Sequence, residues 1–349
     1  MKKSVIWIWI IIAIVALGIS FFGLSRKKAQ QKELQGKLQE TFDEYLPGIV
    51  CWGDSLTAGT GGEGVSYPKV LKQLMQERLF ANIPVAMPLP EVVNMGVGGE
   101  DTHTILGRNG AIPFVVKENM TIPSDTTPVS IVMESASGKA VAPFRQGNAG
   151  AESVEINGVT GTIDVIQDSY TSAEFSYEFI RKEPGEVVYV SEGTPIITSG
   201  SVMWTDYIPV IFMGENGGFN DVKELIEQQR AIIEHQTSHK ERFLIIGLHT
   251  GTKKQRAELE EAMLQEYGEK YINLREELCT KGLEAAGLQG TQEDVEMLQK
   301  GMVPASLMIS DKCHFNAYGY QVIGELIYAR MDELGYFDEV KTTIAEITH

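Results

Sequence analysis

The sequence predicts an α/β protein whose parallel sheet is covered by helices on both faces and interrupted by an inserted antiparallel β domain. Three patterns lead to this prediction. Short apolar runs alternate with amphipathic segments in residues 47–107 and again in residues 207–340, which is typical of βαβ units. Between them, in residues 108–206, the helical period is lost. Ahead of them, an uncharged segment at residues 5–24 predicts an N-terminal transmembrane helix.

Composition limits the class of protein. The chain has 349 residues, of which 43% are apolar and 22% charged, so it can bury the core of one large domain or two smaller ones. Its net charge of -17 argues against a nucleic-acid partner, which usually requires a basic face. The three cysteines, Cys51, Cys279 and Cys313, form no C-x-x-C pair, so we expect neither a disulfide framework nor a zinc site.

The uncharged N-terminal segment is long enough to cross a membrane. A helix over residues 5–24 spans a hydrocarbon core of ~30 Å at ~1.5 Å per residue. We expect a single-pass membrane protein with residues 1–4 as a cytoplasmic tail and the remaining chain outside the cytoplasm. Secretion after cleavage at Ala16-Leu17-Gly18 is the alternative.

A second helix is expected directly after this segment, as a juxtamembrane helix or linker over residues 25–46. Leu34, Leu38 and Phe42 recur at helical spacing and form a narrow apolar stripe. Such a stripe suits a stalk, a dimer seam or a helix docked on the domain, and docking or a stalk is preferred.

The elements of the parallel sheet follow in order. Strands are predicted at 48–52, 91–96, 208–214 and 242–248, and helices at 67–79, 221–236, 253–268 and 316–334. We assign 47–107 and 207–340 to the two parts of one α/β domain and 341–349 to a tail.

The intervening residues 108–206 are expected to form a small antiparallel β domain. Asn157-Gly158 between two alternating runs predicts a hairpin. This domain covers the active site, binds a substrate chain, or has only a structural role.

A serine stands at the end of the first predicted strand, in Gly53-Asp54-Ser55-Leu56. Open α/β sheets bind their ligands at the carboxyl ends of the strands. The motif is not a G-x-S-x-G elbow, because position 57 is Thr57.

A possible base for this serine lies near the other end of the chain. Asp311 precedes His314 by three residues, just before the last predicted helix. A histidine can take the hydroxyl proton of a serine, while an aspartate on its other ring nitrogen selects the tautomer.

Two further motifs follow predicted strands. Asn94-Met95-Gly96-Val97-Gly98-Gly99 offers small residues whose backbone N–H groups can approach a ligand. In Gly214-Glu215-Asn216-Gly217, the asparagine amide can donate to a developing oxyanion.

Together, these four motifs resemble in their order the blocks of the SGNH (GDSL) serine hydrolases. The resemblance implies a flavodoxin-like three-layer α/β/α sandwich, ester hydrolysis, and no metal or organic cofactor. It places the nucleophile on Ser55, the acid and base on Asp311 and His314, and the oxyanion donors on the Ser55 and Gly99 backbone and the Asn216 amide. Gly98 is the one-residue alternative to Gly99.

Two positions depart from the family pattern. Members often have a serine where this chain has Gly98, and an aspartate where it has Gly217. An insert as long as 108–206 between the second and third blocks also leaves the substrate open.

Several polar residues near the motifs are possible pocket residues: Asp54, Glu215, His249 and His103. Glu100, Asp101 and Glu215 can bind a substrate hydroxyl or cap helices. The glycine-rich stretch 59–64 lacks the ending of a phosphate loop, and His235 and His239 lack the remainder of an H-E-x-x-H metal motif.

The sequence thus predicts a membrane-anchored serine esterase that acts on an acylated small molecule or polysaccharide, with O-acetyl groups on a cell-envelope polymer preferred. A lipase, phospholipase or thioesterase is the alternative enzyme. A surface glycan-binding protein without turnover is the alternative of another class. The membrane is the other expected partner, through the N-terminal helix.

Overall fold

The computed structural model describes residues 25–135, 138, 144, 146–169 and 171–348. The predicted tail at 1–4 and the predicted transmembrane segment at 5–24 lie outside these residues. Over the described part of the chain, no helix combines the length and apolar character needed to cross a membrane.

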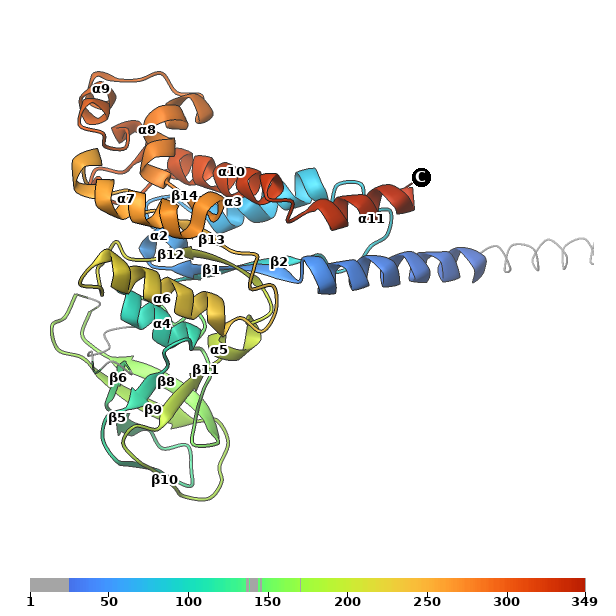
Figure 1. Ribbon diagram of the computed structural model, residues 1–349. Coiled ribbons are helices and arrows are strands. Elements are labelled where there is room, and N and C mark those ends of the chain that lie inside the picture. Colours follow the sequence, from blue (N-terminus) through green and yellow to red (C-terminus); the bar gives the residue numbers. More distant parts are fainter. Residues whose placement is uncertain (1–24, 136–137, 139–143, 145, 170, 349) are drawn as a thin grey trace, which may run out of the picture.

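One part of the molecule is built on a five-stranded parallel sheet with the order β14-β13-β12-β1-β2 (Figure 1). Each neighbouring pair of strands is parallel. Every residue of the central strands β1 and β12 is buried. The strands are β1 (Gly48–Gly53), β2 (Glu91–Gly96), β12 (Ile208–Phe212), β13 (Leu244–Ile246) and β14 (Tyr271–Ile272).

Successive side chains of β1 enter two separate apolar cores, because a strand alternates its side chains between faces. Ile49 and Cys51 belong to one core and Val50 and Trp52 to the other. In Figure 1, α3 and α10 accordingly lie on one side of the sheet and α4 and α6 on the other. The helices of the first core are α3 (Tyr67–Leu74), α8 (Leu274–Ala285), α10 (Ala317–Glu333) and α11 (Asp338–Thr348); those of the second are α4 (Thr102–Asn109), α6 (Val222–His235) and α7 (Lys253–Tyr267).

The helix at residues 25–45 docks on the first core, next to α11. Leu38 and Phe42 are at most 2% exposed, and the hydroxyls of Thr41 and Thr343 lie 3.1 Å apart. Of the three arrangements considered for this helix, docking on the domain is therefore the one observed. The predicted tail at 341–349 is wrong, because α11 runs to Thr348 and buries apolar side chains in the same core.

The insert forms a seven-stranded antiparallel sheet with the order β5-β9-β8-β7-β11-β3-β6 and an apolar core of its own. Its hairpin between β7 and β8 turns at Asn157 and Gly158, whose φ angles of 49° and 78° are those of a type I′ turn. A separate two-stranded sheet pairs β10 with β4. The strands are β3 (Phe114–Val116), β4 (Met120–Ile122), β5 (Val129–Ile131), β6 (Met133–Ser135), β7 (Val154–Ile156), β8 (Val159–Ile166), β9 (Ser176–Arg181), β10 (Val188–Val190) and β11 (Pro195–Thr198).

The predicted fold class is therefore wrong. The chain is a mixed α/β protein with two separate sheets, and the antiparallel sheet has more strands than the parallel one. It is not a single flavodoxin-like sandwich carrying a small insert, because the antiparallel sheet has seven strands and an apolar core of its own. Strands β3 to β6 have three residues each, which is too short for an alternating pattern to be recognised.

A buried carboxylate fixes the helix α9 (Gln292–Gln299) to the following loop. Asp294 is 0% exposed, and its oxygens accept from the backbone N–H and hydroxyl of both Thr291 and Ser306 at 2.7–2.8 Å. Burial by itself raises the pKa of Asp294, but these hydrogen bonds outweigh burial and bring the pKa to about 2.

Replacing Asp294 with asparagine is expected to lower the free energy of unfolding by about 1–3 kcal/mol at neutral pH. The folded pKa lies below the ordinary value of 3.8, so this stabilisation is complete above that value and is lost as the pH falls toward 2. Urea unfolding of wild type and Asp294→Asn, between neutral and acidic pH, measures the difference in their free energies of unfolding, which is expected to become smaller as the pH falls. A difference that stays constant with pH contradicts a stabilising role for the ionised Asp294 carboxylate.

Candidate active site

Ser55 lies at the carboxyl end of the central strand β1, as the first residue of the short helix α2 (Ser55–Ala58). Asp54 caps this helix by accepting from the Leu56 N–H at 2.9 Å. The turn needs glycine before it, since a Cβ at Gly53 would lie 2.1 Å from Thr57 Oγ1 and 2.3 Å from the Phe212 carbonyl oxygen. The strand therefore presents the serine hydroxyl at the edge of the sheet.

His314 lies within hydrogen-bond distance of the serine. Its Nε2 is 2.8 Å from Ser55 Oγ, and its Nδ1 is 2.7 Å from Asp311 Oδ2. Because an ionised carboxylate can only accept, Nδ1 carries the proton and Nε2 is free to accept from the serine hydroxyl. The three side chains thus form one continuous chain of hydrogen bonds.

Asp311 is held in its ionised form by local backbone groups. Its Oδ1 accepts from the N–H groups of Cys313 and His314, each at 2.9 Å. Burial acts to raise the pKa of Asp311, but the hydrogen bonds from the His314 ring and from these two N–H groups bring it to about 2. The side chains of Asp311 and His314 are 43% and 21% exposed, so the base is accessible from solvent.

The loop that carries this pair is braced on two sides. Met308 and Phe315 form a β-bridge across it, and Asn316 caps α10 by accepting from the Gly319 N–H. The glycine-rich stretch 59–64 packs against the same loop, since a Cβ at Gly61 would lie 2.7 Å from the Phe315 carbonyl oxygen. That stretch supports the histidine loop.

Asn216 lies beside Asp54, but both of its amide hydrogens are engaged. Its Nδ2 donates to Asp54 Oδ2 at 3.2 Å and to the Glu100 carbonyl oxygen at 3.0 Å. An oxyanion must therefore displace the longer of these contacts to receive a hydrogen bond from this amide. Gly99 adopts a φ of 76°, a left-handed conformation that suits glycine.

The first departure from the pattern of the hydrolases that the sequence resembles, at Gly98, has a local reason. A Cβ at Gly98 would lie 2.3 Å from Gln146 Oε1, and a Cβ at Gly99 would lie 3.3 Å from Gln146 Nε2. The insert thus brings the Gln146 amide against this pair of glycines, and a serine at position 98 would displace it. Sequence reasoning missed Gln146, because no local pattern marks a residue 47 positions further along the chain.

The second departure, at Gly217, also follows from the backbone. Gly217 has a φ of 77°, and its carbonyl accepts from the Thr102 N–H at 3.1 Å. An aspartate here would be strained by that φ. The loop after β12 is instead tied to the start of α4.

The four possible pocket residues lie beneath the surface of the site. Asp54, His249 and His103 are at most 8% exposed, and the Glu215 side chain is 4% exposed. Burial, followed by the nearby Glu215 and Glu100 charges, raises the pKa of Asp54 to about 7 against the opposing effects of the Leu56 N–H and His249. The four possible pocket residues are therefore buried side chains.

Glu100 belongs to a buried ion pair that connects the site to the insert. Both carboxylate oxygens of Glu100 bind Arg108 rather than capping a helix. Arg108 is 0% exposed and also donates to the Met95 and Ala149 carbonyl oxygens at 2.9 and 2.5 Å. Its guanidinium carbon lies 5.5 Å from the centre of the Trp52 ring. Sequence reasoning missed this arginine, which stands at the predicted boundary of the insert.

A metal centre is not evident in the part of the chain that the structure describes, where no three His, Cys, Asp or Glu side chains converge as ligands. His235 Nε2 lies 3.1 Å from the Ser201 carbonyl oxygen. His239 follows the end of α6 and has a φ of 55°, so the two histidines do not share one helix face.

Comparison with known proteins adds no assignment: no protein-family model and no curated protein sequence matches this chain.

Proposed function

We propose that the protein is a serine ester hydrolase with Ser55 as its nucleophile, His314 as its general base and Asp311 as the residue that orients the base. The observation that carries the proposal is the hydrogen-bond chain of 2.8 Å from Ser55 to His314 and 2.7 Å from His314 to Asp311. Nucleophile, base and orienting group within hydrogen-bond reach are the signature of covalent acyl transfer.

The proposed reaction uses the proton positions that this geometry favours. His314 Nε2 takes the proton of Ser55 as Oγ attacks the ester carbonyl, and Asp311 stabilises the resulting imidazolium. The carbonyl oxygen becomes an oxyanion that accepts from the Ser55 and Gly99 backbone N–H groups and the Asn216 amide. His314 then protonates the leaving alcohol, and a water molecule, activated in the same way, hydrolyses the acyl-enzyme and restores Ser55.

A short acyl group on a bulky alcohol is the substrate class we propose, such as an O-acetyl group on a carbohydrate. Two features support it. The His314 side chain is 21% exposed and Asp311 is 43% exposed, so an ester on a large molecule can reach the base. Gln146 from the insert lies against Gly98 and Gly99, where its amide can bind a polar alcohol.

Covalent labelling tests the proposal directly. A fluorophosphonate probe is expected to modify one residue per chain, and peptide mass spectrometry is expected to locate the adduct on Ser55. Labelling at another residue, or none, contradicts the proposed nucleophile. A p-nitrophenyl ester series then tests the acyl group: acetate is expected to be the better substrate, and a preference for octanoate contradicts the short-acyl assignment.

Replacing Asn216 with alanine is expected to lower kcat by roughly 10²–10³-fold with little change in KM, because an oxyanion donor acts mainly in the transition state. Steady-state hydrolysis of p-nitrophenyl acetate measures both constants. Asn220→Ala is the matched control, since Asn220 lies on the same loop, is exposed, and contacts Glu224 instead. Equal kcat values for wild type and Asn216→Ala exclude this amide from the oxyanion hole.

A further inference from the structure

Both ring nitrogens of the buried His249 face hydrogen-bond acceptors. Its Nε2 lies 2.8 Å from the Cys313 carbonyl oxygen, and a carbonyl can only accept, so Nε2 donates. Its Nδ1 lies 2.9 Å from Glu215 Oε1, at ion-pair distance although off the line of a hydrogen bond. The ring therefore lies between the Cys313 backbone and the Glu215 carboxylate.

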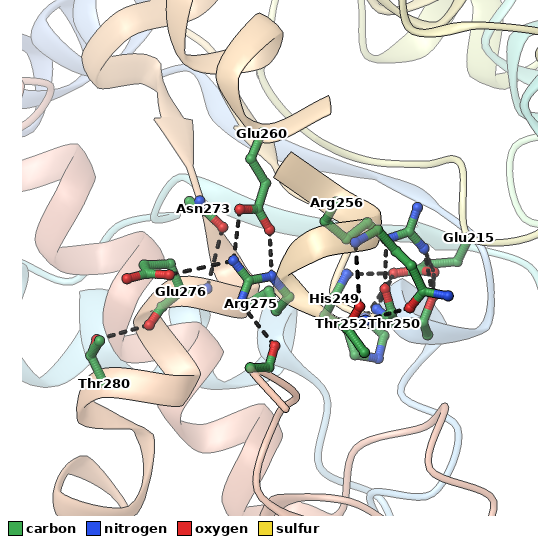
Figure 2. Close-up of polar contacts among 12 residues, drawn as sticks. Glu215, His249, Thr250, Thr252, Arg256, Glu260, Asn273, Arg275, Glu276 and Thr280 are labelled. Carbon is green, nitrogen blue, oxygen red and sulfur yellow. Dashed lines mark hydrogen bonds and ion pairs between the residues drawn. The ribbon is translucent and has the colours of Figure 1, made fainter. Parts of the chain in front are cut away.

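Glu215 is the buried carboxylate beside this ring. Its carboxylate accepts from the backbone N–H of His249 at 2.6 Å and from the Thr250 hydroxyl at 2.6 Å, and Arg256 lies 3.5 Å away (Figure 2). Burial by itself raises the pKa of Glu215, but the adjacent His249, the Thr250 hydroxyl and Arg256 hold this pKa well below its ordinary value. Figure 2 shows the glutamate reaching His249, Thr250 and Arg256 at once.

This pair touches the two loops that carry the proposed chemistry. Glu215 directly precedes Asn216, and Cys313 directly precedes His314. The His249 ring also packs on Phe315, with ring centres 4.4 Å apart. His249 therefore contacts the residues on both sides of His314.

We propose that the buried Glu215–His249 ion pair is a positioning device that sets His314 relative to Asn216. The inference rests on the proposed function, because it assigns the pair to the alignment of that base with that oxyanion donor. The Nε2–H bond fixes the backbone at Cys313, and the ion pair fixes the ring that makes this bond. Loss of the pair lets the base move relative to Ser55, and a misplacement of about 1 Å can cost about 10²-fold in rate.

Three variants separate this role from plain structural support. His249→Phe keeps an aromatic ring against Phe315 but removes both N–H groups. His249→Gln keeps an N–H donor that can reach the Cys313 carbonyl. Glu260→Gln is the matched control, because Glu260 forms the other buried ion pair in Figure 2, with Arg275 at 1% exposure.

The measurement is kcat and KM for p-nitrophenyl acetate, at a temperature where circular dichroism shows each variant folded. His249→Phe is expected to lose about 10²-fold in kcat with KM nearly unchanged, and His249→Gln to recover a large part of that loss. Glu260→Gln is expected to lose stability but keep the wild-type kcat.

Two different failures are distinguishable. If wild type turns over ester through Ser55 but His249→Phe keeps its kcat, or loses no more kcat than Glu260→Gln, the positioning role is overturned and the proposed function stands. If wild type shows no turnover and no phosphonate label on Ser55, the proposed function fails and the inference fails with it.

Discussion

Replacing Ser55 with alanine is expected to lower kcat for p-nitrophenyl acetate by roughly 10⁶-fold, the scale on which loss of a catalytic serine acts in serine hydrolases. In the proposed mechanism this hydroxyl forms the acyl-enzyme, and its Oγ lies 2.8 Å from His314 Nε2. Any rate of the variant that still exceeds uncatalysed hydrolysis in water then comes only from the oxyanion donors and from substrate binding.

Stability of the variant must be checked in parallel, and the matched control is Ser66→Ala. Ser66 is also largely buried and precedes α3, but its side chain makes no capping hydrogen bond. The control is expected to retain wild-type kcat. If Ser55→Ala is folded by circular dichroism and keeps more than a small fraction of the wild-type kcat, covalent catalysis by Ser55 is ruled out.

Replacing Arg108 with methionine is expected to lower the free energy of unfolding by about 3–5 kcal/mol, because it leaves the buried Glu100 carboxylate without its partner. Both side chains of this pair are at most 1% exposed. Arg108 also joins the ends of two strands to the insert, through the Gly53, Met95 and Ala149 carbonyl oxygens. Urea unfolding followed by far-ultraviolet circular dichroism measures the loss.

A double variant and a variant in an exposed ion pair serve as controls for Arg108→Met. Glu100→Leu combined with Arg108→Met removes both buried charges and is expected to be more stable than Arg108→Met alone. Lys223→Ala breaks an exposed pair with Glu227, at 84% and 60% exposure, and is expected to change stability by less than about 1 kcal/mol. If Arg108→Met lowers the free energy of unfolding by no more than Lys223→Ala does, the buried pair has no structural role.

Local sequence patterns predicted much of the part of the molecule that is built on the parallel sheet. The apolar run at 48–52 and the Gly53 that follows it predict a buried strand and a turn, because side-chain period and glycine conformation are properties of neighbouring residues. The motif that begins there places Ser55 at a strand end, and the spacing of Asp311 and His314 allows the two side chains to meet within one loop. Such features depend on a few consecutive residues, so they can be read from the chain alone.

The size of the antiparallel sheet depends on pairing between segments that lie far apart in the sequence. Strand β3 at residues 114–116 pairs with β11 at residues 195–198, and its short length carries no alternating pattern. Pairing between segments so far apart depends on which edges are left free once the other strands have packed. The prediction of a small insert failed for this reason.

The sequence by itself predicted four of the five parallel strands, several of the helices between them, and the candidate serine, histidine and aspartate, because each depends on short-range periodicity or spacing. Tertiary structure alone decided that Asp54 and Glu100 occupy the Asn216 amide, that Arg108 neutralises Glu100, that Gln146 lies against Gly98, and that His249 lies under the His314 loop. These contacts join residues from separate strands, helices and loops. Their energies depend on burial and on the charges brought near, which no local pattern encodes.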